Sequence, residues 1–177
     1  MAGDARLRLF CALRLPGDVV ERLVAWQQAE LHGGRLVPAE NLHVTLAFLG
    51  SRPAEELAAI SGALRAAGLD AGGVQLRVRG YRETRSVGML TLDDEGGRAS
   101  ALAARLHAGL EELGVYRREA RPWLPHLTVL RFKERPRLQP RLPELGEVMP
   151  SDAAVFISRL RPDGAEYESV ETVALGG

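Results

Sequence analysis

A histidine followed two residues later by a threonine occurs twice in the chain, each time inside an apolar run. The pairs are His43 with Thr45 and His126 with Thr128, and the chain has only four histidines. Side chains two apart in a strand point to the same face, so each histidine would share a face with its threonine. Two such polar pairs in core-like strands rarely coincide by chance and predict a cleft lined from both sides.

The chemistry that such a cleft supports is proton transfer. Imidazole gives or takes a proton near neutral pH, so two imidazoles on opposite sides can act as general acid and general base. The threonine hydroxyls can donate hydrogen bonds to negative charge that develops between them. The arrangement suits in-line attack of water on a phosphodiester, without a covalent intermediate. A metal site built on His43 and His126 is disfavoured, because no carboxylate or cysteine flanks either histidine at ligand spacing. We therefore expect no metal and no cofactor.

Composition narrows the class of partner. The 177 residues carry zero formal net charge with a pI near 6.9, whereas proteins that grip long duplexes usually have a basic excess. A small nucleotide or an RNA end is favoured. Cys11 is the only cysteine, which indicates a reducing compartment. No apolar stretch approaches the ~20 residues that span a bilayer, so we expect a cytoplasmic protein without membrane contact, and a monomer.

The hydrophobic periodicity predicts an α+β fold. A strand, a helix, a His-Thr strand, a helix and a strand come before residue 80, and a similar order follows it. We expect a single domain, 1–177, of two pseudo-symmetric lobes, roughly 1–80 and 81–177 with some interleaving. Each lobe would be an antiparallel sheet with helices packed outside, facing a central cleft. The Pro- and Arg-rich segment 133–150 is predicted to be a mobile loop over the site, and His107 is expected to be exposed.

Longer motifs around these residues resemble a known family. The segments 8–13 (RLFCAL), 40–50 (ENLHVTLAFLG), 125–129 (PHLTV) followed by Arg131, and 158–164 (SRLRPDG) resemble the two-histidine (2H) phosphoesterase superfamily. Within it they look like the bacterial and archaeal RNA 2′,3′-cyclic phosphodiesterases, historically called 2′-5′ RNA ligases. The resemblance runs from about Arg6 to Leu175, and the first and last of these segments are its most specific parts.

The resemblance implies hydrolysis of an RNA or nucleotide 2′,3′-cyclic phosphate to a 2′-phosphate, with RNA 3′ ends or small cyclic nucleotides as ligands. It implies that His43 is the general acid for the leaving 3′ oxygen and that His126 is the general base for water. Thr45 and Thr128 would hold the phosphate oxygens. By the same resemblance, the side chains flanking the terminal base are Phe48 and Arg131.

Two departures from the family pattern put the substrate range in doubt more than the reaction type. Leu130 stands where the family more often has a small residue, and Met89 stands where many members have an aromatic one. Two alternatives stay open at this point. One is ligation or cleavage of 2′-5′ linked RNA, which uses the same acid and base. The other is a non-catalytic module that binds nucleotides or RNA ends, although both His-Thr pairs are intact.

Overall fold

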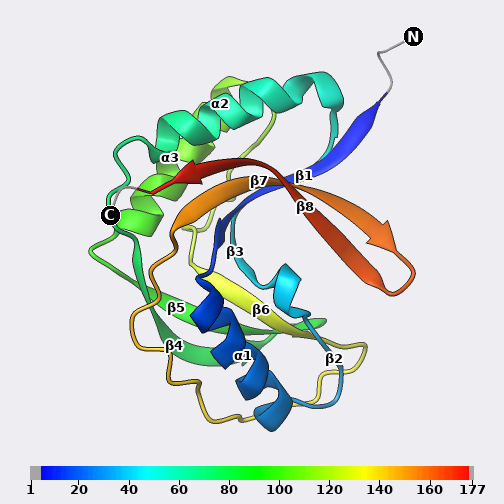
Figure 1. The fold of residues 1–177 in the computed structure, drawn as a ribbon. Helices are drawn as coiled ribbons and strands as arrows, with labels where there is room; N and C mark the ends of the chain where they lie inside the picture. The colour runs from blue at the N-terminus through cyan, green and yellow to red at the C-terminus, as the bar shows by residue number, and fades with distance from the viewer. Residues whose placement is uncertain (1–4, 176–177) are drawn as a thin grey trace.

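The computed structural model describes residues 5–175, which form an α+β fold with two antiparallel sheets (Figure 1). This confirms the predicted fold class. The α-helices are α1 (Gly17–Glu30), α2 (Leu57–Gly68) and α3 (Arg98–Glu112), and two short 3-10 helices are η1 (Ala39–Asn41) and η2 (Ala54–Glu56). The strands are β1 (Arg6–Arg14), β2 (Arg35–Leu36), β3 (His43–Pro53), β4 (Gln75–Glu83), β5 (Val87–Glu95), β6 (His126–Arg131), β7 (Asp152–Arg161) and β8 (Gly164–Ala174).

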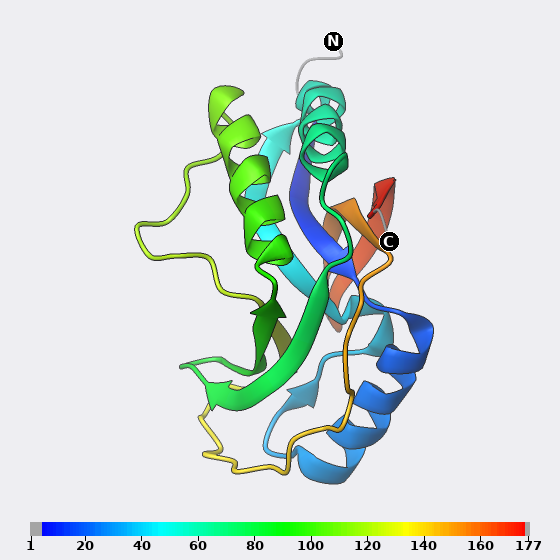
Figure 2. The same ribbon diagram turned by 90° about the vertical axis from the view of Figure 1, so that its left-hand side faces the viewer.

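The first sheet has the strand order β3-β1-β7-β8. Its central strand β1 pairs with β3 on one side and with β7 on the other, so its apolar run is buried on both faces. Burying such a run on both faces needs cover above and below the sheet. Helices α2 and α3 lie side by side over one face (Figure 2), with α2 against β7 and β8 and α3 against β3.

The second sheet has the order β2-β6-β5-β4. Helix α1 covers it, and a buried side chain fixes the contact: the Gln27 amide donates hydrogen bonds to the carbonyls of Val37 and Val129, at 3.0 and 2.9 Å. A buried amide needs such partners, because an unpaired polar group in a core costs about 1–3 kcal/mol. No helix in the range 5–175 is long and apolar enough to cross a membrane.

The two sheets do not divide the chain at residue 80, because segments of its two halves are interleaved between them. The terminal hairpin β7–β8 belongs to the sheet of the N-terminal strands, and β4 belongs to the sheet of β5 and β6. The reason lies in the run Ala153–Ile157, which is buried on consecutive positions. A strand that is buried on both faces must lie inside a sheet, and pairing with β1 on one side and β8 on the other puts it there.

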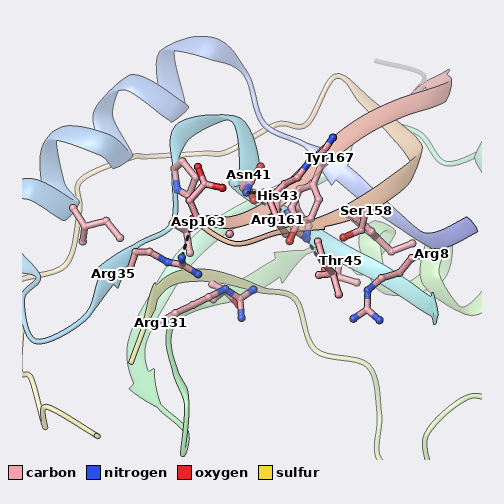
Figure 3. A pocket seen from close by; sticks show the side chains of 18 of the residues that line it. Arg8, Arg35, Asn41, His43, Thr45, Arg131, Ser158, Arg161, Asp163 and Tyr167 are labelled. Carbon is pink, nitrogen blue, oxygen red and sulfur yellow. Dashed lines mark hydrogen bonds between the residues drawn. The ribbon is translucent and has the colours of Figure 1, made fainter. Parts of the chain in front are cut away.

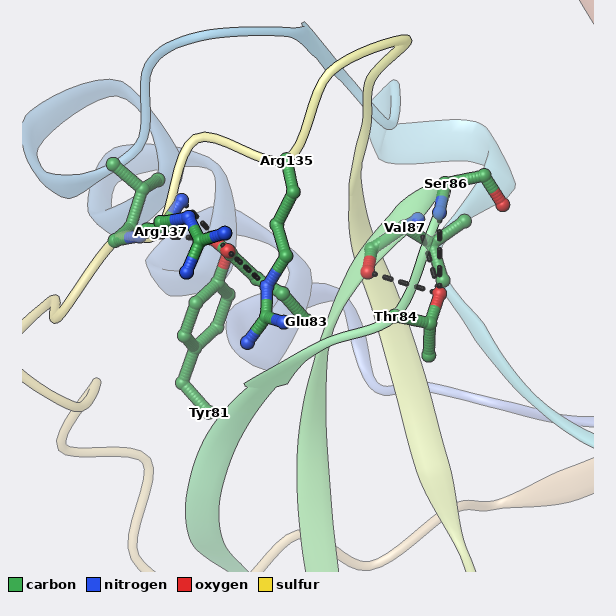
Figure 4. A network of polar contacts seen from close by, with 8 residues as sticks. Tyr81, Glu83, Thr84, Ser86, Val87, Arg135 and Arg137 are labelled. Carbon is green, nitrogen blue, oxygen red and sulfur yellow. Dashed lines mark hydrogen bonds and ion pairs between the residues drawn. The ribbon is translucent and has the colours of Figure 1, made fainter.

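The segment 133–150 is not a loop over the site. It runs along the far end of the second sheet, where Val148 pairs with Leu76 and the Trp26 indole N–H donates to the Arg141 carbonyl at 2.7 Å. The Glu83 carboxylate anchors its start, because it accepts hydrogen bonds from the backbone N–H groups of residues 137 and 138 and from the Tyr81 hydroxyl (Figure 4).

Candidate active site

A pocket of about 570 Å³ opens between the two sheets (Figure 3). Strands β1, β3, β7 and β8 line it from one sheet, and β2 and β6 line it from the other. The expected central cleft is therefore present. Of the site residues predicted from the sequence, five line the pocket: His43, Thr45, Phe48, Thr128 and Arg131. His126 is not among the lining residues.

Two hydrogen bonds orient His43, the first residue of β3. Its Nδ1 lies 2.7 Å from the Asn41 carbonyl oxygen, and its Nε2 lies 2.8 Å from the Thr45 hydroxyl oxygen. A carbonyl oxygen only accepts, so Nδ1 carries the hydrogen of the neutral ring. Nε2 then accepts from the Thr45 hydroxyl. Nε2 therefore presents a lone pair, and the hydroxyl proton of Thr45 is directed at it.

An aromatic cluster encloses the His43 ring. The ring centroids of Phe10, Tyr167 and Phe156 lie 5.0, 5.5 and 6.5 Å from that of the imidazole. The pKa of His43 is lowered from 6.5 to about 4, chiefly by this burial and to a smaller extent by the positive charges of Arg131 and His126, while the hydrogen bond to the Asn41 carbonyl opposes the shift. His43 is therefore uncharged at neutral pH.

A bulge in β3 sets the position of Thr45. The pairing with β1 shifts between Cys11 and Ala12, which leaves the backbone around Leu46 outside the regular ladder. Side chains from elsewhere satisfy two of the carbonyls. The Trp123 indole N–H donates to the Thr45 carbonyl at 3.1 Å, and His107 Nε2 donates to the Leu46 carbonyl at 2.8 Å. Bulges beside active sites commonly aim a side chain, and this one directs the Thr45 hydroxyl.

His107 is thus buried, with 5% of its surface exposed, and the expectation that it is exposed is wrong. The position of His107 in the helical repeat gave no sign of an acceptor, because the Leu46 carbonyl becomes available only through the bulge in a distant strand. His32 lies at the surface as its position after helix α1 suggested.

The second His-Thr pair lies on β6. Thr128 lines the pocket, while Leu127 and Val129 turn into the core, as the alternation of a strand requires. His126 begins the strand and is partly exposed, and its Nδ1 donates to the Leu124 carbonyl at 3.1 Å. Nε2 is therefore the nitrogen left for chemistry, as in His43, and the charge of His126 is close enough to lower the pKa of His43.

Phe48 and Arg131 both line the pocket. The Arg8 guanidinium is placed over the Phe48 ring, 4.8 Å from its centroid. Arg131 is the cross-strand partner of Arg35 in the other sheet. Figure 3 shows Arg8 and Arg131 on opposite sides of His43 and Thr45. Phe48 therefore has Arg8 as its guanidinium partner.

The terminal hairpin closes one wall of the pocket, and reasoning from the sequence assigned no site residue to it. Two hydrogen bonds tie its tip to the segment before β3: Arg35 Nη1 donates to the Asp163 carbonyl at 2.9 Å, and Asn41 Nδ2 donates to the Ala165 carbonyl at 2.8 Å. Asn41 Oδ1 is the one buried side-chain polar atom without a partner among the described residues. The segment 158–164, which the family resemblance singled out, forms this wall.

No three His, Cys, Asp or Glu side chains within residues 5–175 are grouped so that they could hold a metal ion. The polar residues that line the pocket include an imidazole, several hydroxyls and four guanidiniums, against one carboxylate, that of Asp163. Arg8 and Arg131 form no salt bridge within the described part of the chain, although many other arginines there do. Unpaired cations beside an imidazole and two hydroxyls form a site for an anion such as a phosphate.

Known proteins share this sequence and this fold. A Thermus thermophilus protein named RNA 2′,3′-cyclic phosphodiesterase is 36% identical over 187 aligned positions, which cover 97% of this chain and 91% of that protein. A crystal structure of a Thermus thermophilus protein superimposes with a TM-score of 0.83 at 34% identity, covering 97% of this chain and 99% of that one. Escherichia coli LigT in complex with NADP⁺ gives a TM-score of 0.82 at 26% identity, covering 98% and 100%.

The family model that matches describes the 2′-5′ RNA ligase superfamily, and it matches residues 15–163. This range contains both His-Thr strands and the start of the hairpin. The pocket between the two sheets, with a histidine and a threonine on β3 and a second such pair on β6, agrees with the match. The chain belongs to the 2′-5′ RNA ligase superfamily.

Proposed function

We propose that the chain hydrolyses the 2′,3′-cyclic phosphate of an RNA 3′ end, or of a free nucleotide, to a 2′-phosphate. The observation that carries the proposal is the pocket itself, which brings His43 and Thr45 from one sheet together with Thr128 from the other. The relative named RNA 2′,3′-cyclic phosphodiesterase supports the reaction. The NADP⁺ complex of LigT supports a nucleotide as the ligand.

In this proposal His126 removes a proton from water, and the water oxygen attacks the phosphorus. The bond from phosphorus to O3′ breaks, and His43 delivers a proton to O3′. The products are a 2′-phosphomonoester and a free 3′-hydroxyl. The hydroxyls of Thr45 and Thr128 donate to the non-bridging oxygens, where negative charge grows in the transition state. In this proposal Phe48 and Arg131 flank the terminal base, and both line the pocket.

The general-acid role requires His43, which is uncharged at neutral pH, to gain a proton when the substrate binds. A bound cyclic phosphate brings a negative charge, which favours the imidazolium and offsets the burial. The proton enters at Nε2, since Nδ1 already carries one toward the Asn41 carbonyl. A protonated Nε2 no longer accepts from Thr45, so the Thr45 hydroxyl can turn its proton to the phosphate. Substrate binding, protonation of His43 and reorientation of Thr45 are then one linked event.

The proposed reaction uses side chains alone, with no metal or cofactor. We further propose that the protein acts as a cytoplasmic monomer. Support for a reducing compartment comes from Cys11, a free thiol that is fully buried in β1. Burial raises the pKa of this thiol from 9.0 to about 12, which keeps it protonated and unreactive.

The test is hydrolysis of a 2′,3′-cyclic nucleotide and of an RNA oligonucleotide with a 2′,3′-cyclic end, both in EDTA. The products are resolved into 2′- and 3′-phosphates. We expect only the 2′-phosphate, and we expect His43→Ala and His126→Ala each to lose on the order of a hundredfold or more in kcat. His32→Ala is the matched control, because His32 lies at the surface away from the pocket. Full activity in either active-site variant, or activity that EDTA abolishes, would refute the mechanism.

A further inference from the structure

Asn41, the single asparagine of the chain, contacts two parts of the pocket at once. Its backbone carbonyl accepts a hydrogen bond from His43 Nδ1 at 2.7 Å, and its side-chain Nδ2 donates to the Ala165 carbonyl on β8 at 2.8 Å. The backbone of Asn41 is itself held in η1, because its N–H donates to the Pro38 carbonyl at 2.9 Å. One residue therefore links the imidazole on β3 to the terminal hairpin that forms a wall of the pocket.

This link leads to the tyrosine ring that covers His43. Ala165 and Tyr167 are two residues apart on β8, so their side chains share a face, and both line the pocket. The Tyr167 ring meets the imidazole edge-on, with 5.5 Å between the centroids. A second hydrogen bond to the hairpin, from Arg35 to the Asp163 carbonyl, is exposed and holds the turn, which is further from the tyrosine along the chain. The partly buried amide contact at Ala165 is therefore better placed to hold the ring.

The Asn41 side chain carries a cost in stability that packing does not explain. Only 8% of the residue is exposed, and its Oδ1 has no partner among the described residues. A buried acceptor without a partner destabilises a fold, and a leucine of similar shape would avoid that cost. The amide takes this orientation because the Ala165 carbonyl can only accept, so Nδ2 must face it. Costs of this kind are commonly retained at functional sites.

We propose that Asn41 is a positioning residue, which holds the terminal hairpin against His43 and so keeps the Tyr167 ring over the imidazole. Without the amide, the hairpin moves away from η1, water reaches the imidazole, and the general acid is less well placed. A displacement of 1 Å can cost on the order of a hundredfold in rate. The effect on the rate rests on the proposed function, whereas the effect on the surroundings of His43 does not.

The test is Asn41→Leu, which keeps the size of the side chain and removes both amide groups. We expect kcat for adenosine 2′,3′-cyclic phosphate to fall roughly tenfold or more. The urea concentration at the midpoint of unfolding should stay unchanged or rise, because the unpaired acceptor is gone. The pKa of His43, measured by NMR titration, should rise from about 4 by up to about one unit, as water reaches the ring. A merely structural role would lower stability and leave this pKa in place.

Trp26→Phe is the matched control. It also removes an N–H group that donates to a backbone carbonyl, that of Arg141 at 2.7 Å, but Trp26 does not line the pocket. This variant should change neither kcat nor the pKa of His43. Equal effects in the control and in Asn41→Leu would show a general loosening of the fold and would overturn the proposal.

A double-mutant cycle tests the route from Asn41 to the imidazole. If Asn41 acts through the Tyr167 ring, Asn41→Leu should have little further effect on the pKa of His43 once Tyr167→Ala is present. The charges of Arg131 and His126 also act on this pKa, and both stay in every variant. Additive shifts in the double variant would overturn the route through the hairpin.

The remaining outcomes are also decisive. An unchanged kcat or an unchanged pKa of His43 in Asn41→Leu overturns the positioning role. Asn41→Ala removes the same amide with a smaller side chain and should give the same rise in pKa, so the test does not depend on one variant being folded. Absence of turnover in the wild-type protein refutes the proposed function instead. The pKa of His43 needs no turnover and then decides the role of Asn41, so the two failures are distinguishable.

Discussion

Enclosing His43 in an aromatic cluster has a consequence that can be measured directly. The pKa of His43 falls from 6.5 to about 4, and at 1.36 kcal/mol per unit this corresponds to at most about 3 kcal/mol against the imidazolium. Tyr167→Ala removes one wall of the cluster and admits water to the ring. Phe10 and Phe156 stay, as do the repulsive charges, so we expect a rise of about one unit toward the ordinary value. Tyr167→Phe keeps the ring and should leave the pKa near 4.

The same shift sets a dependence of stability on pH. Between pH 6.5 and pH 4 the unfolded chain binds a proton at this position and the folded chain does not, so the free energy of unfolding falls as the pH falls through this window. The loss reaches at most about 3 kcal/mol near pH 4. In Tyr167→Ala the folded-state pKa is nearer to 6.5, so the decline should be shallower. Urea titrations at a series of pH values measure both slopes.

The assay for the pKa is an NMR titration of the imidazole Cε1–H signals, assigned with single His→Gln variants. We expect the His43 signal of the free protein to move only below pH 5. Addition of a nucleotide monophosphate should raise its midpoint, because the phosphate charge favours the imidazolium. A midpoint within half a unit of 6.5 in the free protein would contradict the argument from burial. A midpoint unmoved by the nucleotide would contradict the linked protonation of His43 and Thr45.

The remaining predictions concern one hydroxyl, one buried carboxylate and one thiol. Thr45→Val removes the hydroxyl that we expect to donate a hydrogen bond in the transition state, and it should lower kcat roughly a hundredfold. Thr45→Ser keeps a hydroxyl and should retain most of the rate. Similar single-turnover rates for the two variants would refute the role of the hydroxyl. Burial alone would raise the pKa of Glu83, but the hydrogen bonds from the Leu138 N–H, the Tyr81 hydroxyl and the Arg137 N–H outweigh the burial and lower this pKa. The stabilising effect of the Glu83 carboxylate is therefore present above the unfolded-state pKa of ~4.3 and is lost as the pH falls through the folded-state pKa. At pH 7, Glu83→Gln should lower the free energy of unfolding, measured by urea titration, by about 2–3 kcal/mol. Arg135→Gln should lower it by less than about 1 kcal/mol, because the Arg135 side chain is half exposed. Equal losses in the two variants would show that the carboxylate does not anchor the segment 133–150. Cys11 should resist alkylation in the native protein and react once urea unfolds it, and rapid modification of the folded chain would contradict its burial.

The local sequence pattern predicted the helices and strands of this fold well, but it predicted less well which strands pair with one another. Alternation along β3 and β6 was enough to place each histidine beside its threonine, because strand geometry alone decides which face a side chain takes. The pairing of β7 with β1 was not visible in the same way. Either sheet could have accepted an apolar hairpin, and the choice depends on a match between segments about 140 residues apart.

The site also depends on contacts between distant segments that the local sequence does not reveal. The residues to which we assign the chemistry were recognisable by type and spacing, whereas those that position them were not. Trp123 and His107 hold the bulge of β3 through carbonyls that only the folded backbone offers. The pairing of Phe48 with Arg8 likewise depends on the register between β1 and β3, and no local pattern encodes that register.

The central place of β7 has a consequence for how the protein is made. Strand β1 is synthesised before the other described strands, yet its second partner and two of the aromatic rings around His43 come from residues 152–174. Pairings between such distant segments slow folding, since a long loop must close before any contact offsets its entropy. During synthesis the nascent chain holds both His-Thr pairs while the enclosure of His43 is missing. The environment that lowers the basicity of His43 is thus completed only after β7 and β8 have been synthesised, and a chain truncated before β7 would carry the same histidine with an affinity for protons nearer the ordinary value.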